Sequence, residues 1–184
     1  PSLSELLDGQ RQGGAPIAIT PTGYIEADDT DALKAVLKAV NELQRDDVVA
    51  WFPVSAAWLR GPSLRQLIAV LSRVDHPVAV SFGDKSNPLA SSTAISGLVE
   101  LLSSVPGTSV FRTDHHAGLE AVARSGGSFS FGLLPSARRV TPPGSRGMAQ
   151  NKRDKRPHVI VPSLHRIVRS TMLSDWFVNS LPER

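Results

Sequence analysis

The chain has 184 residues, 41% of them hydrophobic and 20% charged, the balance of a soluble globular protein with one core and too few residues for two ordinary domains. It contains no cysteine, which excludes disulfides, thiol nucleophiles and cysteine-ligated metals in this sequence and fits a reducing, cytoplasmic compartment. No apolar run approaches the ~20 residues that span a bilayer, and we expect neither a signal peptide nor a membrane partner.

The charge is distributed unevenly along the chain. Residues 1–105 hold 8 Lys/Arg against 12 Asp/Glu, a net charge of −4, whereas residues 106–184 hold 12 against 5, a net charge of +7. An anionic ligand is therefore expected to bind in the second half of the chain.

Short apolar runs, typical of buried strands, alternate with amphipathic runs, typical of helices, along most of the sequence. Residues 1–15 are predicted to be a loosely held lead-in. In chain order the sequence then predicts a strand over 16–20, a helical face over 33–43, a strand over 47–52, a helical face over 64–71, a strand over 76–82, a helical face over 95–102, a strand over 109–112, a helix around 119–122, strands over 128–132 and 158–161, and a final helix over 163–179.

This alternation predicts an α/β fold with a mainly parallel sheet of about six strands, in a single domain over residues 1–184. Strands that are separated by helices run parallel, and near-continuous apolar runs suit a sheet that is buried on both faces. Two arrangements stay open, an open doubly wound sheet and an incomplete TIM-barrel-like sheet. A complete barrel takes ~250 residues, so length alone favours the open sheet.

The run from 110 to 132 contains the candidate catalytic residues. It reads as a strand, a charged turn, a short helix, a Gly-Gly stop and the next strand, and Arg112, Asp114, His115 and His116 crowd the turn. Strand alternation predicts that Arg112 and Asp114 share a face. In the functional interpretation Arg112 holds an anion while Asp114, His115 or His116 transfers protons. In the structural alternative Asp114 caps the helix and Arg112 is its ion-pair partner.

Other polar residues follow the remaining strands, and the carboxyl ends of parallel strands meet at one edge of a sheet. Asp84, Lys85, Arg138 and Arg139 are the further candidates for substrate binding. The Asp84–Lys85 segment lacks the glycines of a phosphate-binding loop and is better explained as an Asx-type turn. Adjacent histidines rarely bind one metal ion, so we predict no metal site. The edge is also expected to include Thr20, Thr22, Tyr24, Ser55, Trp58, Asn87, Ser136, Ser163, His165 and Arg166.

Residues 135–157 are predicted to form a basic mobile loop. Lys152, Arg153, Lys155 and Arg156 are candidates for binding a nucleic-acid backbone in a salt-dependent way. No aromatic residue lies among the cations of this segment, so base stacking is not indicated. A solvated surface loop explains the same charges equally well.

We therefore expect an enzyme, or an enzyme-derived domain, that binds an anionic ligand, phosphorylated or nucleotide-like, at the carboxyl ends of its strands. The alternative is a non-catalytic module that binds nucleic acid or protein through residues 138–156 and the C-terminal helix. That helix is also the expected contact in a homo-oligomer or larger assembly. The sequence indicates no particular reaction or cofactor.

Overall fold

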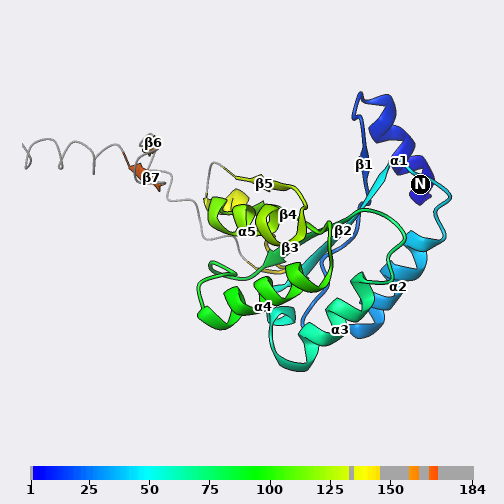
Figure 1. Ribbon diagram of the computed structural model, residues 1–184. Helices are drawn as coiled ribbons and strands as arrows, with labels where there is room; N and C mark the ends of the chain where they lie inside the picture. Colours follow the sequence, from blue (N-terminus) through cyan, green and yellow to red (C-terminus); the bar gives the residue numbers. More distant parts are fainter. Residues whose placement is uncertain (1, 133–134, 146–157, 162–165, 170–184) are drawn as a thin grey trace, which may run out of the picture. The chain divides into compact units, whose positions relative to one another are not determined.

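The computed structural model describes residues 2–132, 135–145, 158–161 and 166–169 (Figure 1). It divides into two compact units, Pro1–Ser145 and Arg146–Arg184. The first unit contains the whole parallel sheet. In chain order its elements are α1 (Leu3–Gln12), β1 (Ala18–Ile19), α2 (Thr30–Asn41), β2 (Val48–Ser55), the 3-10 helix η1 (Ala56–Leu59), α3 (Gly61–Leu71), β3 (Val78–Gly83), α4 (Ser92–Ser104), β4 (Ser109–Thr113), α5 (His115–Ser125), β5 (Phe129–Phe131) and the 3-10 helix η2 (Pro135–Arg138).

The predicted α/β class is confirmed, with five parallel strands in place of six. The strands lie in the order β1-β2-β3-β4-β5, and all four neighbouring pairs are parallel. A doubly wound sheet reverses its strand order at a switch point. This sheet follows chain order without a reversal, so the doubly wound alternative is wrong and the order is that of a barrel-type sheet.

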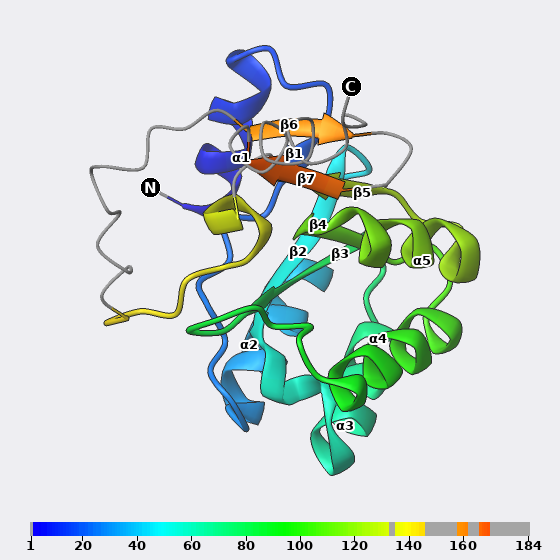
Figure 2. The same cartoon turned by 90° about the vertical axis from the view of Figure 1, so that its left-hand side faces the viewer.

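One hydrophobic core joins helices α2 to α5 to a single face of the sheet. Phe52 of β2, Val80 of β3 and Val110 of β4 belong to it, together with buried residues of all four helices. The helices accordingly lie together on one side of the strands (Figure 2). All six residues of the central strand β3 are buried, which explains why its sequence is a continuous apolar run instead of an alternating one.

Residues 1–15 were predicted to be a loose lead-in, but most of them form α1. Ser2 and Glu5 make a reciprocal capping box at its start. Leu7 is fully buried against Ala18 and Val48. The three leucines of α1 all lie in its first five residues, Leu3 to Leu7, so the apolar pattern is too short to show a helical period in the sequence.

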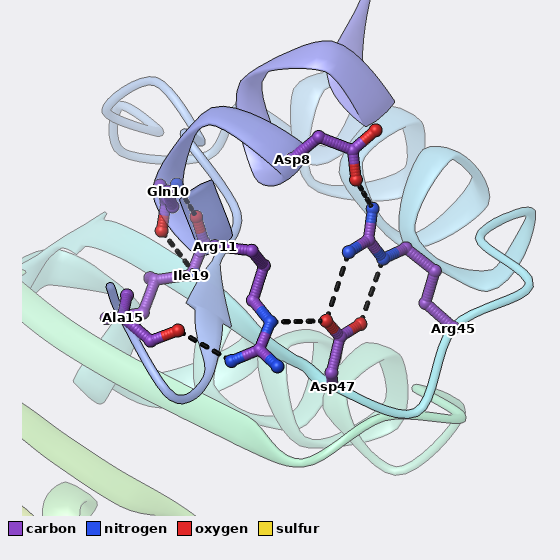
Figure 3. A network of polar contacts seen from close by, with 7 residues as sticks. All are labelled: Asp8, Gln10, Arg11, Ala15, Ile19, Arg45 and Asp47. Atoms are coloured by element: carbon purple, nitrogen blue, oxygen red, sulfur yellow. Dashed lines mark hydrogen bonds and ion pairs between the residues drawn. The ribbon is translucent and has the colours of Figure 1, made fainter. Parts of the chain in front are cut away.

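Polar contacts fix α1 to the amino-terminal end of the sheet (Figure 3). The Arg45 guanidinium donates to both carboxylate oxygens of Asp47, at 2.9 and 3.0 Å, and to Asp8. Arg11 adds a second ion pair to Asp47 at 2.9 Å. Asp47 therefore joins α1 to the start of β2.

We predict that this ion-pair network makes the protein sensitive to acid. Hydrogen bonds from Arg45 lower the pKa of Asp47 below its usual value, so the carboxylate stabilises the fold above about pH 4, and this contribution is lost as the pH falls through the lowered pKa. Urea unfolding at pH 7 and at pH 3 should show a smaller loss of stability in Asp47→Asn than in the wild type. Equal losses in the two proteins would contradict the prediction.

The second unit contains β6 (His158–Val161) and β7 (Arg166–Arg169), which pair antiparallel with Val159 opposite Val168. The strand predicted over 158–161 is confirmed, although it pairs with β7 in a separate two-stranded sheet. The predicted C-terminal helix is wrong over 166–169, where the chain forms β7. β-Branched residues favour strands, and Ile167 and Val168 of β7 pair with Ile160 and Val159 of β6. The other residues of the predicted helix, 163–165 and 170–179, lie outside the described part.

None of the helices in the described ranges has the length and apolar character needed to span a membrane.

Candidate anion-binding edge

The polar residues that follow β1 to β5 lie at one edge of the sheet, because all five strands are parallel. We call this the carboxyl edge. Its members in the described chain are Thr20, Thr22, Tyr24, Ser55, Asp84, Lys85, Arg112, Asp114, His115, His116, Arg138 and Arg139.

Asp114 is the N-cap of α5. Its Oδ1 accepts hydrogen bonds from the backbone N–H groups of His116 and Ala117, at 2.9 and 3.0 Å. The residue has the extended backbone that N-caps adopt. The carboxylate is thus oriented toward the helix, as the structural alternative predicted.

We predict that Asp114→Ala destabilises the protein by about 1 kcal/mol, because two N–H groups of the first turn lose their acceptor. Asp114→Asn keeps an acceptor oxygen and should lose less stability than Asp114→Ala. The measurement is urea unfolding followed by circular dichroism. An Asp114→Ala variant as stable as the wild type would show that the cap contributes nothing.

The prediction that Arg112 and Asp114 share a face and form an ion pair is wrong. Arg112 has a left-handed backbone, with φ of 54°, and the β4–β5 register shifts between Val110 and Thr113. As a result Val110 and Thr113 are both buried while Arg112 is exposed. No Arg112–Asp114 ion pair occurs within the described residues. A bulge of this kind interrupts the period of two on which the prediction rested.

Side-chain hydroxyls hold the irregular end of β4 in place. The Arg112 N–H donates to Ser130 Oγ at 3.1 Å, and the buried Ser81 hydroxyl of β3 donates to the Phe111 carbonyl at 2.8 Å. Trp51 Nε1 donates in turn to Ser81 Oγ at 2.8 Å. The conformation of Arg112 is therefore supported from both neighbouring strands.

His115 and His116 begin α5 directly after this bulge. Their ring centroids are 3.9 Å apart, and the rings are tilted by 40°. His115 Nε2 is buried and has no hydrogen-bond partner within the described residues, whereas His116 is exposed. The start of α5 thus carries one imidazole with a buried nitrogen and one exposed imidazole, three and four residues after Arg112 in the chain.

Arg138 and Arg139 reach the carboxyl edge because the chain after β5 returns to β3. The Val140 N–H donates to the Phe82 carbonyl at 3.1 Å, and Val140 pairs in parallel with Gly83; Figure 2 shows this segment in yellow beside the end of β3. Arg138 Nε donates to the Gly132 carbonyl at 2.8 Å. Arg139 Nε is buried without a partner in the described part of the chain.

The predicted basic mobile loop, 135–157, is described only as far as 145. That part contains η2 and the backbone hydrogen bond from the Val140 N–H to the Phe82 carbonyl. The candidate nucleic-acid-binding residues Lys152, Arg153, Lys155 and Arg156 lie outside the described residues.

The loop after β3 is a turn, as the sequence indicated. Asp84 Oδ1 accepts from the Lys85 N–H, and Asn87 Oδ1 accepts from the Leu89 N–H at 3.0 Å. The Lys85 side chain is exposed. Asp84 and Lys85 therefore flank the carboxyl edge at the end of β3.

Tyr24 occupies the end of β3 opposite the helices, a role that was not predicted from the sequence. Its hydroxyl donates to the Gly83 carbonyl at 3.3 Å. Burial raises the pKa of Tyr24, with a smaller contribution from the carboxylates of Glu26 and Asp84 and an opposing hydrogen bond to Ser55. The sequence could have indicated this position of Tyr24, because Pro21 and Gly23 end β1 shortly before it. The chain then pairs with β2 again, at Ile25 and Val54.

Comparison of the chain with protein-family models, with curated proteins and with solved structures found no match.

Proposed function

We propose that this protein binds an anionic ligand, phosphorylated or nucleotide-like, at the carboxyl edge beside β4 and β5. The conformation of Arg112 carries the proposal. A left-handed backbone costs a non-glycine residue roughly 1–2 kcal/mol, yet the fold supports it with hydrogen bonds from two strands, and the guanidinium is exposed. Strained residues of this kind concentrate at functional sites.

The neighbouring groups suit a negative charge. Arg112 is exposed at the end of β4. Arg138 and Arg139 lie at the same edge, and a guanidinium binds phosphate oxygens in a bidentate manner. Lys85 adds a further exposed cation, while Asp84 is available to accept from a ligand hydroxyl.

If the ligand is a substrate, His115 and His116 are the proposed proton-transfer groups. Asp114 is assigned to capping, because its Oδ1 already accepts two backbone hydrogen bonds. It acts on the histidines by fixing the first turn of α5, which carries both rings. A cytoplasmic location belongs to the same proposal.

The proposal is tested by calorimetric titration with inorganic phosphate and with adenosine monophosphate. We expect one or both to bind, more weakly as salt is added, and Arg112→Ala to weaken binding at least about tenfold, the loss of roughly one charge-assisted contact. The control is Arg65→Ala, which removes an exposed arginine from α3 and should leave binding unchanged. The proposal fails if neither probe binds, or if the two variants bind equally.

A further inference from the structure

One peptide group of β4 is held by side-chain hydroxyls on both sides. It joins Phe111 to Arg112, beyond the paired residues of β3 and β4 and within the shift of the β4–β5 register. Its carbonyl accepts from Ser81 Oγ at 2.8 Å, and its N–H donates to Ser130 Oγ at 3.1 Å. In the regular part of a parallel sheet, backbone groups of the neighbouring strands make these hydrogen bonds. The orientation of this peptide group therefore depends on two serine side chains.

The orientation of the peptide group determines the backbone conformation of Arg112. Turning the group over by half a turn changes the φ of Arg112 by the same amount, which moves it from 54° into the negative region that ordinary residues prefer. The observed orientation is thus the strained one. In the relaxed alternative the carbonyl would point toward Ser130 and the N–H toward Ser81.

The hydroxyl of Ser81 favours the strained orientation. Its oxygen accepts from Trp51 Nε1 at 2.8 Å, and an indole N–H can only donate. The single hydroxyl proton is then directed to β4, where a carbonyl can accept it and an N–H cannot. Because Ser81 is fully buried, the relaxed peptide would leave this proton without an acceptor, at a cost in free energy. The hydrogen bonds therefore run in one direction, from Trp51 through Ser81 to the Phe111 carbonyl.

Ser130 does not select between the two orientations. It is exposed to solvent, and its hydroxyl can donate to a carbonyl as well as accept from an N–H. Of the two serines that hold the peptide group, Ser81 is therefore the one that sets its orientation.

We propose that Ser81 is a positioning residue of the anion site. This inference rests on the proposed function, because it concerns the binding of the anion by Arg112. Ser81 is fully buried, so a ligand at the carboxyl edge does not touch it. It acts by restricting Arg112 to one backbone conformation in place of two. Such pre-organisation strengthens binding, because less conformational freedom is lost when the anion binds.

Calorimetric titration of Ser81→Ala with inorganic phosphate and with adenosine monophosphate tests the effect on binding. We expect the affinity to fall about three- to tenfold, the equivalent of one neutral hydrogen bond. Ser125→Ala is the matched control and should bind as the wild type does. Ser125 is also buried, and its hydroxyl donates at 2.7 Å to the carbonyl of Thr108, which precedes β4 at its other end. Equal affinities in the two variants would overturn the inference.

A second measurement detects the strain at Arg112 without any ligand. Urea unfolding compares Arg112→Gly with Arg112→Ala in the two serine backgrounds. With Ser125→Ala we expect Arg112→Gly to be the more stable, because glycine adopts the left-handed backbone without steric cost. With Ser81→Ala the peptide group can turn over, so the advantage of Arg112→Gly should disappear. An advantage that persists without the Ser81 hydroxyl would overturn the inference.

The two measurements distinguish a failure of this inference from a failure of the proposed function. If the wild type binds neither probe, the proposed function fails and the effect of Ser81 on affinity fails with it, while the unfolding data still decide whether Ser81 holds the peptide group. If the wild type binds and the two serine variants bind alike, only the inference fails.

Where Ser81→Ala does not fold, Trp51→Phe takes its place in both measurements. This variant keeps the aromatic ring and the Ser81 hydroxyl but removes the N–H that directs the hydroxyl proton to β4. Its control is Trp58→Phe, because the Trp58 indole also donates to an oxygen, the Glu26 carbonyl, at 2.8 Å. Equal affinities in Trp51→Phe and Trp58→Phe would overturn the inference.

Discussion

Gly83→Ala is expected to destabilise the protein by about 1–3 kcal/mol, the range for a methyl group forced into a filled space. A Cβ at this position would lie 2.4 Å from Tyr24 Cε2 and 2.8 Å from the Val140 carbonyl oxygen. The first neighbour is an aromatic ring that packs over the end of β3, and the second belongs to the segment that brings Arg138 and Arg139 to the carboxyl edge. Both must move to admit the methyl group.

The matched control is Gly23→Ala, since a Cβ at Gly23 has no atom within 4 Å and its backbone is not left-handed. Urea unfolding of both variants separates a close approach at Gly83 from a general effect of replacing glycine. Adding Tyr24→Ala to Gly83→Ala removes one of the two obstructions, so the double variant should lose less than the sum of the single losses. Additive losses, or a Gly83→Ala variant as stable as the wild type, would show that Tyr24 does not pack against Gly83.

The fold class was predictable because its signal is repeated. Four helices with clear apolar faces separate five apolar runs, and each repeat reinforces the parallel arrangement. The strand order was not predictable, because a doubly wound sheet and a barrel-type sheet use the same strand–helix alternation. Their difference lies in which face each helix covers. Here Phe52, Val80 and Val110 share one core with all four helices, and only the three-dimensional contacts show this.

The candidate edge was predicted in its location but not in its geometry. Strand ends place Arg112, Asp84 and the histidines at one edge, and that follows from parallel topology alone. The bulge at Arg112 depends on hydroxyl groups of Ser130 and Ser81, which are distant in sequence. Helix capping by Asp114 was recognised as an alternative because it depends on residues within three positions of Asp114. Local interactions can thus be predicted from the sequence where long-range ones cannot.

Arg112→Gly is expected to be more stable than Arg112→Ala by about 1 kcal/mol, because glycine adopts a left-handed backbone without the steric cost that alanine retains. This order is the reverse of the usual one within a strand, where glycine is the less stable residue. The measurement is urea unfolding of both variants. At Arg65, within α3, the order should be the ordinary one, with Arg65→Gly less stable than Arg65→Ala by about 1 kcal/mol. If Arg112→Gly is the less stable variant at its own position, Arg112 is not strained.

The same pair of variants separates the strain from the charge. Both remove the guanidinium, so both should lose phosphate or nucleotide binding at least about tenfold, although only one of them relieves the backbone. A glycine variant that is more stable than the alanine variant and yet does not bind would mean that the fold maintains a costly conformation at Arg112 in order to present its side chain. If binding instead survives in Arg112→Gly and is lost in Arg112→Ala, the backbone of the bulge makes the contact with the anion and the guanidinium does not.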